Sequence, residues 1–255
     1  ENTNPLVAAK SVFLSSKNPL DGLLQIMKLG FAGRDFLKKS AFSGHFTSEG
    51  INNKEAKIKL AEARSIARKY GKEVANSIPI FLHANPFMPL TPILGPNGEL
   101  WKPTHSILPF SKVLKHNNDF ESLMTEYKEK MEQHEVAMNR MFSFIDSNAF
   151  LYEPTFLWKD KQSIYHKKAY PKDLKDIPVH QDNPDGLKLV HEIKDRIEEM
   201  CLANGAIHFQ IGKDYPYLKS RTKETRALLC SIKKQFDPKN LINPGSLGFD
   251  LVNGN

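Results

Sequence analysis

Several features are scarce in this sequence of 255 residues, and each scarcity excludes a class of protein. Only two cysteines occur, Cys201 and Cys230, which excludes a small scaffold held together by disulfides. With only 14 glycines the chain cannot carry a collagen-like repeat. No stretch approaches the roughly 18 consecutive apolar residues that a membrane-spanning helix needs. What remains is a globular chain, whose length suits one large domain or two small ones.

The chain also lacks the short motifs that most directly reveal an enzyme class. It has no G-x-G-x-x-G and no G-x-x-x-x-G-K-[ST] sequence, so neither dinucleotides nor nucleotide phosphates have an evident cradle. The zinc motif H-E-x-x-H, the pair C-x-x-C and the hydrolase motif G-x-S-x-G are absent as well. The two cysteines lie far apart on predicted helix faces, where buried thiols are the plainer interpretation.

Positive charge is in moderate excess, with 36 Lys and Arg against 29 Asp and Glu and a formal net charge of +7. A solvated surface with surplus lysine explains this excess without a special partner, and no nucleic-acid motif accompanies it. The alternative, from a different functional class, is a basic non-enzymatic interaction module that binds an anionic partner. It rests on a cluster formed by Lys159, Lys161, His166, Lys167, Lys168, Lys172 and Lys175.

Hydrophobic periodicity predicts helices and strands in mixed order, without internal repeats or a long linker. The predicted helices span residues 19–28, 53–70, 119–138, 184–204 and 222–236. The predicted strands span residues 42–46, 73–84, 141–145, 149–158 and 206–211, with 141–158 as a hairpin. The last helix is expected to turn Leu228, Leu229 and Ile232 inward. Because strict alternation of strands and helices is absent, the pattern favours an α+β fold with a sheet covered by helices on one side.

The predicted strand 206–211 alternates between polar and apolar side chains. His208 and Gln210 point to one face of it, and Ile207, Phe209 and Ile211 point to the other. This alternation is typical of a strand that lines a cavity, and equally of an edge strand in a half-exposed sheet. The pattern by itself leaves both interpretations open.

The C-terminal part of the chain resembles a known family. Residues 204–215 (NGAIHFQIGKDY), a following helix and residues 237–245 (DPKNLINPG) resemble the C-terminal end of FAD-linked oxidases of the vanillyl-alcohol oxidase and p-cresol methylhydroxylase family. This family includes D-lactate dehydrogenases, glycolate oxidase subunits, 4-cresol dehydrogenase-like enzymes and aldonolactone oxidases. Further segments that look like the cap-domain strand of bacterial members are 85–87, 94–96, 98–101 and 103–109.

The resemblance implies a C-terminal cap domain: an antiparallel, ferredoxin-like sheet covered by helices on one face, as in the C-terminal domain of FAD-linked oxidases. Residues 1–255 would form this single cap or substrate domain, with residues 205–249 packed toward the flavin. The N-terminal FAD-binding domain would be a separate partner that is absent from this chain. We therefore expect FAD in the full-length protein, and neither flavin nor turnover in this chain alone.

The resemblance also implies a reaction and a setting. The complete enzyme would oxidise a hydroxylated substrate by hydride transfer to flavin, either a 2-hydroxy acid such as D-lactate or glycolate, or a phenolic or benzylic alcohol. The expected location is the cytoplasm, with a peripheral membrane contact as an alternative. A homodimer stays open, the electron acceptor is not identified, and no nucleic-acid partner is expected.

This chemistry needs a base, because a hydroxyl proton must leave while the flavin takes the hydride. A neutral histidine, with an ordinary pKa of about 6.5, suits that role. Relatives place polar groups from the matching strand over the flavin, which makes His208 the first candidate base and His105 the second. Lys213 is the candidate cation for the reduced flavin or for a substrate carboxylate. The plainer alternatives are a structural His105 bonded to a loop carbonyl and a surface Lys213.

Other candidates follow from the same resemblance. Gln210 and Asn243 are candidates for contact with the flavin, and Tyr152, Glu153 and Asn85 are candidates for contact with the substrate. The plainer alternatives are a turn-forming asparagine, a core tyrosine and a surface glutamate. Relatives of the D-2-hydroxyglutarate dehydrogenase type hold a divalent metal through a G-D-G-N-x-H pattern. That pattern is absent, so no metal is predicted.

Overall fold

The computed structural model divides the chain into two compact units, residues 1–90 and residues 91–255, and each is described by itself. The described residues are 40–74, 94–95, 97–145, 147–169, 178–210, 212–215 and 217–251. Most of the first unit lies outside these ranges, so the single domain expected from the sequence stays a prediction. The predicted helix 19–28 and nearly all of the predicted strand 73–84 also lie outside the described residues.

The described part of the first unit contains one helix, α4 (Asn53–Ala67). Asn52 is its N-cap and accepts hydrogen bonds from the backbone N–H groups of Lys54 and Glu55. The helix predicted over residues 53–70 is confirmed apart from its last turn. The strand predicted over residues 42–46 is wrong: residues 40–50 form neither helix nor strand, and no described strand pairs with them.

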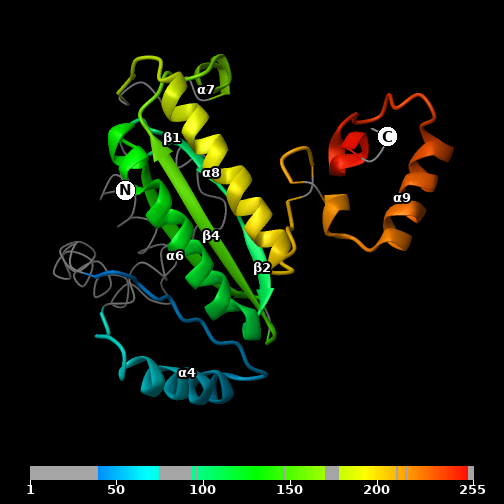
Figure 1. Ribbon diagram of the computed structural model, residues 1–255. Coiled ribbons are helices and arrows are strands. Elements are labelled where there is room, and N and C mark those ends of the chain that lie inside the picture. Colours follow the sequence, from blue (N-terminus) through cyan, green and yellow to red (C-terminus); the bar gives the residue numbers. More distant parts are fainter. Residues whose placement is uncertain are drawn as a thin grey trace. The chain divides into compact units, whose positions relative to one another are not determined.

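The second unit contains an antiparallel sheet of four strands, β1 (Leu100–Pro103), β2 (Ser106–Pro109), β3 (Ala137–Ile145) and β4 (Ala149–Trp158). The long strand β4 is central (Figure 1). Strand β3 pairs along the whole of one edge of β4, while β1 and β2 pair one after the other along its second edge. The hairpin predicted over residues 141–158 is therefore confirmed, although its first strand already begins at residue 137.

Strands β1 and β2 share one register on β4, but the ladder is interrupted between them. At the interruption, Thr104 donates its backbone N–H to the carbonyl of Pro154 at 2.9 Å. Pro154 has no N–H with which to return the second hydrogen bond of this pair. The missing donor accounts for the break at Thr104 and His105, within an otherwise continuous run from residue 100 to residue 109.

Two long helices, α6 (Phe110–Gln133) and α8 (Pro184–Ala203), pack against this sheet (Figure 1). Helix α8 begins where predicted, because the Asn183 side chain accepts a hydrogen bond from the Gly186 N–H at 2.9 Å. Helix α6 begins at residue 110 rather than at the predicted residue 119. No proline or glycine interrupts residues 110–118, so the helix extends back to its N-cap Pro109 and leaves Asp119 as an interior residue.

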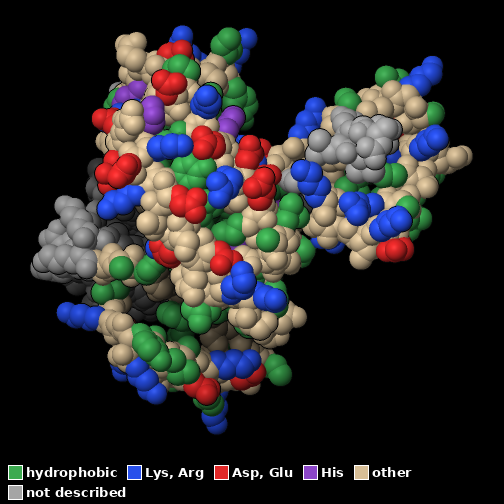
Figure 2. All heavy atoms as spheres, viewed as in Figure 1, with side chains coloured by type: hydrophobic (Ala, Val, Ile, Leu, Met, Phe, Trp, Pro, Cys, Tyr) green, Lys and Arg blue, Asp and Glu red, His purple; other side chains and the backbone are tan. Residues whose placement is uncertain are grey.

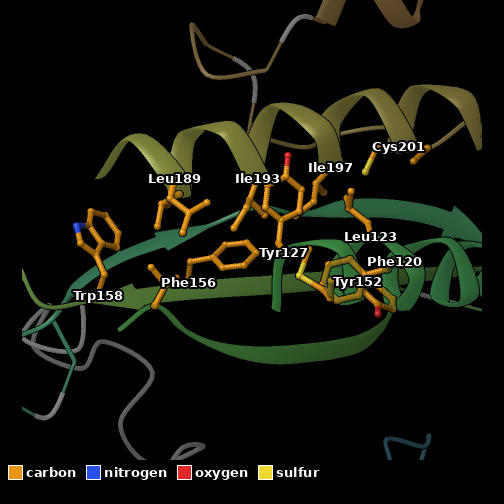
Figure 3. Packing of buried hydrophobic residues seen from close by; sticks show 14 of the residues in the cluster. Phe120, Leu123, Tyr127, Tyr152, Phe156, Trp158, Leu189, Ile193, Ile197 and Cys201 are labelled. Atoms are coloured by element: carbon orange, nitrogen blue, oxygen red, sulfur yellow. The ribbon is translucent and has the colours of Figure 1, made fainter. Parts of the chain in front are cut away.

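The core lies between these helices and the sheet. Figure 3 shows Phe156 and Tyr152 of β4 facing Ile193 and Ile197 of α8. The cluster also contains Leu108, Phe120, Leu123, Met124, Tyr127, Val136, Trp158, Leu189, Val190, Cys201 and Ala206. Fully burying a large apolar side chain contributes about 2 kcal/mol, so this cluster is the main source of stability of the second unit. The α+β class with an antiparallel sheet is confirmed.

The C-terminal segment contains the 3-10 helices η2 (Tyr217–Ser220) and η3 (Ser246–Leu251), with α9 (Lys223–Phe236) between them. Thr222 caps α9 as predicted, accepting a hydrogen bond from the Thr225 N–H at 3.3 Å. The prediction that α9 turns its apolar side chains inward is wrong, because none of its residues is buried and Leu228 is 62 % exposed. Periodicity identifies the apolar face of a helix but not what covers it. Within the described residues, no helix combines the length and apolar character needed to cross a bilayer.

Candidate functional site

The outer edge of the β1–β2 run offers backbone groups that β4 does not use. In the antiparallel ladder, the N–H and C=O groups of His105 and Ile107 point away from β4. Ile107 exchanges two hydrogen bonds with Ile207, at 2.8 and 3.1 Å. The groups of His105 are taken by side chains instead: its N–H donates to Tyr215 Oη at 3.1 Å, and its carbonyl accepts from His208 Nδ1 at 2.6 Å. The edge is thus closed by one bridge and two aromatic side chains.

The strand predicted over residues 206–211 is wrong in extent, because within its described residues only Ile207 makes a bridge. After the bridge the backbone turns, and the N–H groups of Phe209 and Gln210 both donate to His105 Nε2, at 3.0 and 3.2 Å. His105 Nε2 thus accepts the two backbone N–H groups that would otherwise be free to continue the strand ladder after Ile207. The sequence pattern could not reveal this, since the acceptor lies about a hundred residues away.

The hydrogen bonds fix the tautomers of the two histidines. His105 accepts at Nε2, so its proton is on Nδ1, which lies 3.0 Å from Tyr215 Oη. His208 donates from Nδ1 to a carbonyl, so Nε2 of the neutral ring carries a lone pair. This Nε2 atom is buried and has no hydrogen-bond partner in the described part of the chain. Such an atom is an available proton acceptor.

Ring contacts hold the three side chains in place. Tyr215 stacks on His208 with ring centroids 4.4 Å apart and an interplanar angle of 22°. His105 contacts Tyr215 edge-on at 4.5 Å and Phe209 at 4.0 Å. Tyr215 is in contact with both histidines, so its ring, together with the hydrogen bond from His208 to the His105 carbonyl, helps to fix how His208 lies relative to His105.

Burial sets the protonation of this cluster. Burial lowers the pKa of His105 from 6.5 to about 4, and burial also lowers the pKa of His208. Burial raises the pKa of Glu153, which is the residue of β4 opposite His105 in the strand register. At neutral pH both imidazoles are therefore uncharged, as a proton acceptor must be.

Charged groups surround the cluster on the side of α8. The ammonium of Lys194 forms an ion pair with Glu198 and donates to the backbone carbonyl of Asp214 at 2.9 Å. Lys102 of β1 reaches the Asp214 carboxylate at 3.0 Å. The segment that carries Tyr215 is thus tied to both α8 and β1.

The structure brings the two predicted bases together, and the other predicted site residues that it describes lie in different environments. Gln210 and Lys213 are exposed and follow His208 in the same segment, where Gln210 contributes its backbone N–H to His105. Asn243 has a left-handed backbone with φ of 47° in the turn after α9, which matches its plainer interpretation as a turn-forming residue. The loop 237–245 is held by Asp237, whose carboxylate accepts from the N–H groups of Leu241 and Ile242.

The predicted substrate residues lie in three different environments. Tyr152 is a buried core residue whose hydroxyl donates to Asn117 Oδ1 at 3.0 Å, which matches its plainer interpretation. Glu153 is half-buried and lies on the opposite face of β4 from Tyr152. The pKa of Tyr215 is raised mainly by the burial of its own ring, and the charge of Glu153 is one of the further influences that raise it. Asn85 lies outside the described residues.

Two members of the site were not singled out from the sequence, Tyr215 and Lys194. Tyr215 ends the segment 204–215 that carries the family resemblance, and this position could have drawn attention to it. Lys194 gave one signal: it falls between Val190 and Ile197 on the apolar side of α8, where a lysine is unusual.

The basic cluster of the alternative hypothesis is only partly described. Lys159 pairs with Glu135 at 2.8 Å, Lys167 and Lys168 lie on the short helix α7 (Ile164–Ala169), and Lys172 and Lys175 lie outside the described residues. On the face shown in Figure 2, basic and acidic side chains are interspersed over α6 and α8. The described residues also contain no group of three or more His, Cys, Asp and Glu side chains that could hold a metal ion.

Comparison of the sequence with protein-family models and with curated proteins finds no match.

Proposed function

We propose that residues 91–255 act as the substrate-side domain of an FAD-dependent oxidoreductase, with His208 as the acceptor of the substrate hydroxyl proton. The observation that carries this proposal is the buried, unpartnered Nε2 of His208. The other ring nitrogen of His208, Nδ1, donates to the His105 carbonyl, so the lone pair on Nε2 has a fixed direction. A nearby hydroxyl would donate to Nε2 and then lose its proton to it.

The substrate would be a hydroxylated small molecule, either a 2-hydroxy acid or a phenolic or benzylic alcohol. When bound, FAD would supply the hydride acceptor. The chain itself would orient the hydroxyl, keep water from His208 and receive the proton. The lowered pKa of His208, caused mainly by burial, favours the neutral ring that this role requires.

The residues of this chain that would meet the flavin are exposed, as contact with a separate domain requires. Gln210 and Lys213 lie a few residues after His208 and are exposed, so their side chains are available to a cofactor held elsewhere. The uncovered apolar stripe of α9, formed by Leu228, Ile232 and Phe236, would pack against the FAD-binding domain, in keeping with a role of residues 205–249 toward the flavin. The fold in this proposal is the C-terminal domain of FAD-linked oxidases.

The test is to purify the protein from its complete coding sequence and to record its absorbance spectrum. We expect the bands of oxidised FAD, which disappear when a suitable 2-hydroxy acid or aromatic alcohol is added without oxygen. The 255-residue chain alone should bind no flavin. A full-length protein without flavin would overturn the proposal.

The role of His208 is tested in the flavin-loaded protein. His208→Gln should slow flavin reduction about 100- to 10,000-fold, with the flavin content unchanged, because the proton acceptor is lost. His191→Gln, at an exposed position of α8, is the matched control. Equal rates in the two variants would remove His208 from the mechanism.

A further inference from the structure

Helix α8 has a buried lysine, Lys194, on its apolar face. Lys194 is only 5 % exposed and lies one turn from Val190 and Glu198 along the helix. Burying an ammonium group costs several kcal/mol unless its donors are satisfied, and lysine is rarely buried for packing alone. Its burial therefore needs a reason beyond the core of α8.

The contacts of Lys194 lead to the segment that follows His208. Its ammonium forms an ion pair with Glu198, donates to the Asp214 carbonyl at 2.9 Å and lies 3.7 Å from the Asp214 carboxylate. The same nitrogen lies 5.1 Å from the centroid of the Tyr215 ring, within the range of a cation–π interaction. Lys194 thus holds both the backbone and the aromatic ring at residues 214–215.

Tyr215 links the contacts of Lys194 to the position of His208. One part of Tyr215, the hydroxyl, is anchored to the N–H of His105, and its ring stacks on His208 at 4.4 Å. Because His208 is also bonded to the His105 carbonyl, it is fixed on two sides. If the contacts of Lys194 with residues 214 and 215 were removed, the Tyr215 ring would no longer be fixed against His208.

We propose that Lys194 is a positioning residue, which fixes Tyr215 against His208 and keeps Nε2 of His208 oriented and unprotonated. Its positive charge acts in the same sense as its contacts, since a nearby cation disfavours a second positive charge on the imidazole. Burial is the main cause that lowers the pKa of His208; the hydrogen bond to the His105 carbonyl raises it, and the nearby charge of Lys194 adds to the lowering. The other charged or titratable groups facing this cluster are Lys102, His105, Glu153, Glu198, Asp214 and Tyr215.

This inference rests on the proposed function for the meaning of His208, but its test requires neither flavin nor substrate. The 255-residue chain, labelled at histidine, is titrated with acid and followed by the NMR resonance of each imidazole Cε1–H. His208→Gln assigns the resonance of His208. The titration therefore succeeds or fails independently of whether the protein is an oxidoreductase.

In the variant Lys194→Met the titration midpoint of His208 should move to higher pH, toward that of an ordinary histidine, and its resonance should broaden as the ring loses a fixed position. Lys188→Met, at an exposed position of the same helix, should leave it unchanged. An unchanged midpoint in Lys194→Met overturns the proposal.

Lys194→Met leaves the buried Glu198 unpaired, and this variant can fail to fold for that reason alone. The double variant Lys194→Met/Glu198→Leu removes both charges and keeps the helix face apolar. It should fold, retain the broadened His208 resonance and titrate above the wild type. If it titrates like the wild type with a sharp resonance, Lys194 is a structural residue only.

Discussion

His116 contacts Ser106 and His208 contacts the neighbouring His105, and the two histidines differ in how completely their ring nitrogens are used. His116 on α6 has Ser106 Oγ 3.2 Å from Nε2 and Asn204 Nδ2 3.3 Å from Nδ1. His208 has a partner for Nδ1 alone. Burial lowers the pKa of both rings, so a displaced pKa does not distinguish them.

The difference shows what distinguishes a structural histidine from a candidate base. Successive residues of a strand point to opposite faces, so Ser106 directs its side chain to the core while His105 belongs to the other site. Around His116, Asn204 also donates to Asp119 at 2.8 Å and accepts from Lys115 at 2.8 Å, which completes a closed network. In the described residues the network around His116 uses both ring nitrogens, whereas Nε2 of His208 is left as an unused acceptor.

The largest effect expected from the buried rings of His105 and His116 is a loss of stability in acid. The pKa of His105 and that of His116 lie at about 4 in the folded protein, mainly because of burial, against 6.5 in the unfolded chain. The unfolded chain therefore binds protons first as the pH falls. The stabilisation is fully present above pH 6.5 and is lost toward pH 4, by up to about 3 kcal/mol for each histidine.

Urea denaturation at a series of pH values between 7 and 4 measures this loss. His116→Gln should weaken the pH dependence, because one of the two fully buried rings is gone. A free energy of unfolding that stays constant over this range would contradict the assignment of both rings as neutral.

An effect of intermediate size should separate the two histidines at neutral pH. His116→Ala removes one hydrogen bond each from Ser106 and Asn204 and leaves a cavity where the buried ring was, so it should cost about 2–4 kcal/mol of stability. His208→Ala removes one hydrogen bond and a stacked ring, and should cost about 1–2 kcal/mol. Thermal or urea denaturation of both variants gives the comparison, and equal losses would show that the sites are not different in kind.

The smallest effect concerns access to the His116 side of the sheet. Cys201 of α8 is buried, and burial raises the pKa of its thiol to about 12, whereas Cys230 of α9 is half-buried. A thiol reagent should modify Cys230 in the folded protein and Cys201 only after denaturation. Cys230→Ser should abolish the native reaction. Rapid modification of Cys201 in that variant would show that the network is open to solvent.

Much of the second unit follows from sequence patterns, because they reflect local causes. The hairpin of β3 and β4 shows in its apolar runs, and α8 and α9 begin at the cap residues Asn183 and Thr222. The start of α6 was missed, because Asp119 looks like a cap but instead pairs with Lys115 within the helix. A local pattern fails at such a residue, because an aspartate is typical both of a helix N-cap and of an ion pair within a helix.

The candidate site was only half predictable for a different reason. The family resemblance named His105 and His208, and the structure places them side by side. The turn at Phe209 and Gln210 could not be predicted, because it depends on hydrogen bonds to His105 that cross the fold. Nor could the burial of Lys194, since its partners Asp214 and Tyr215 belong to a segment without regular structure.

The proline in the middle of β4 has a consequence for how this sheet can change over evolutionary time. Pro154 withholds one hydrogen bond and so divides the neighbouring run into β1 and β2, each with its own short ladder. Substitutions in β1 can then be absorbed without shifting the register of β2, which anchors the core through Leu108. The two histidines meet at this junction, beside Pro154, the residue of β4 that has no N–H to offer.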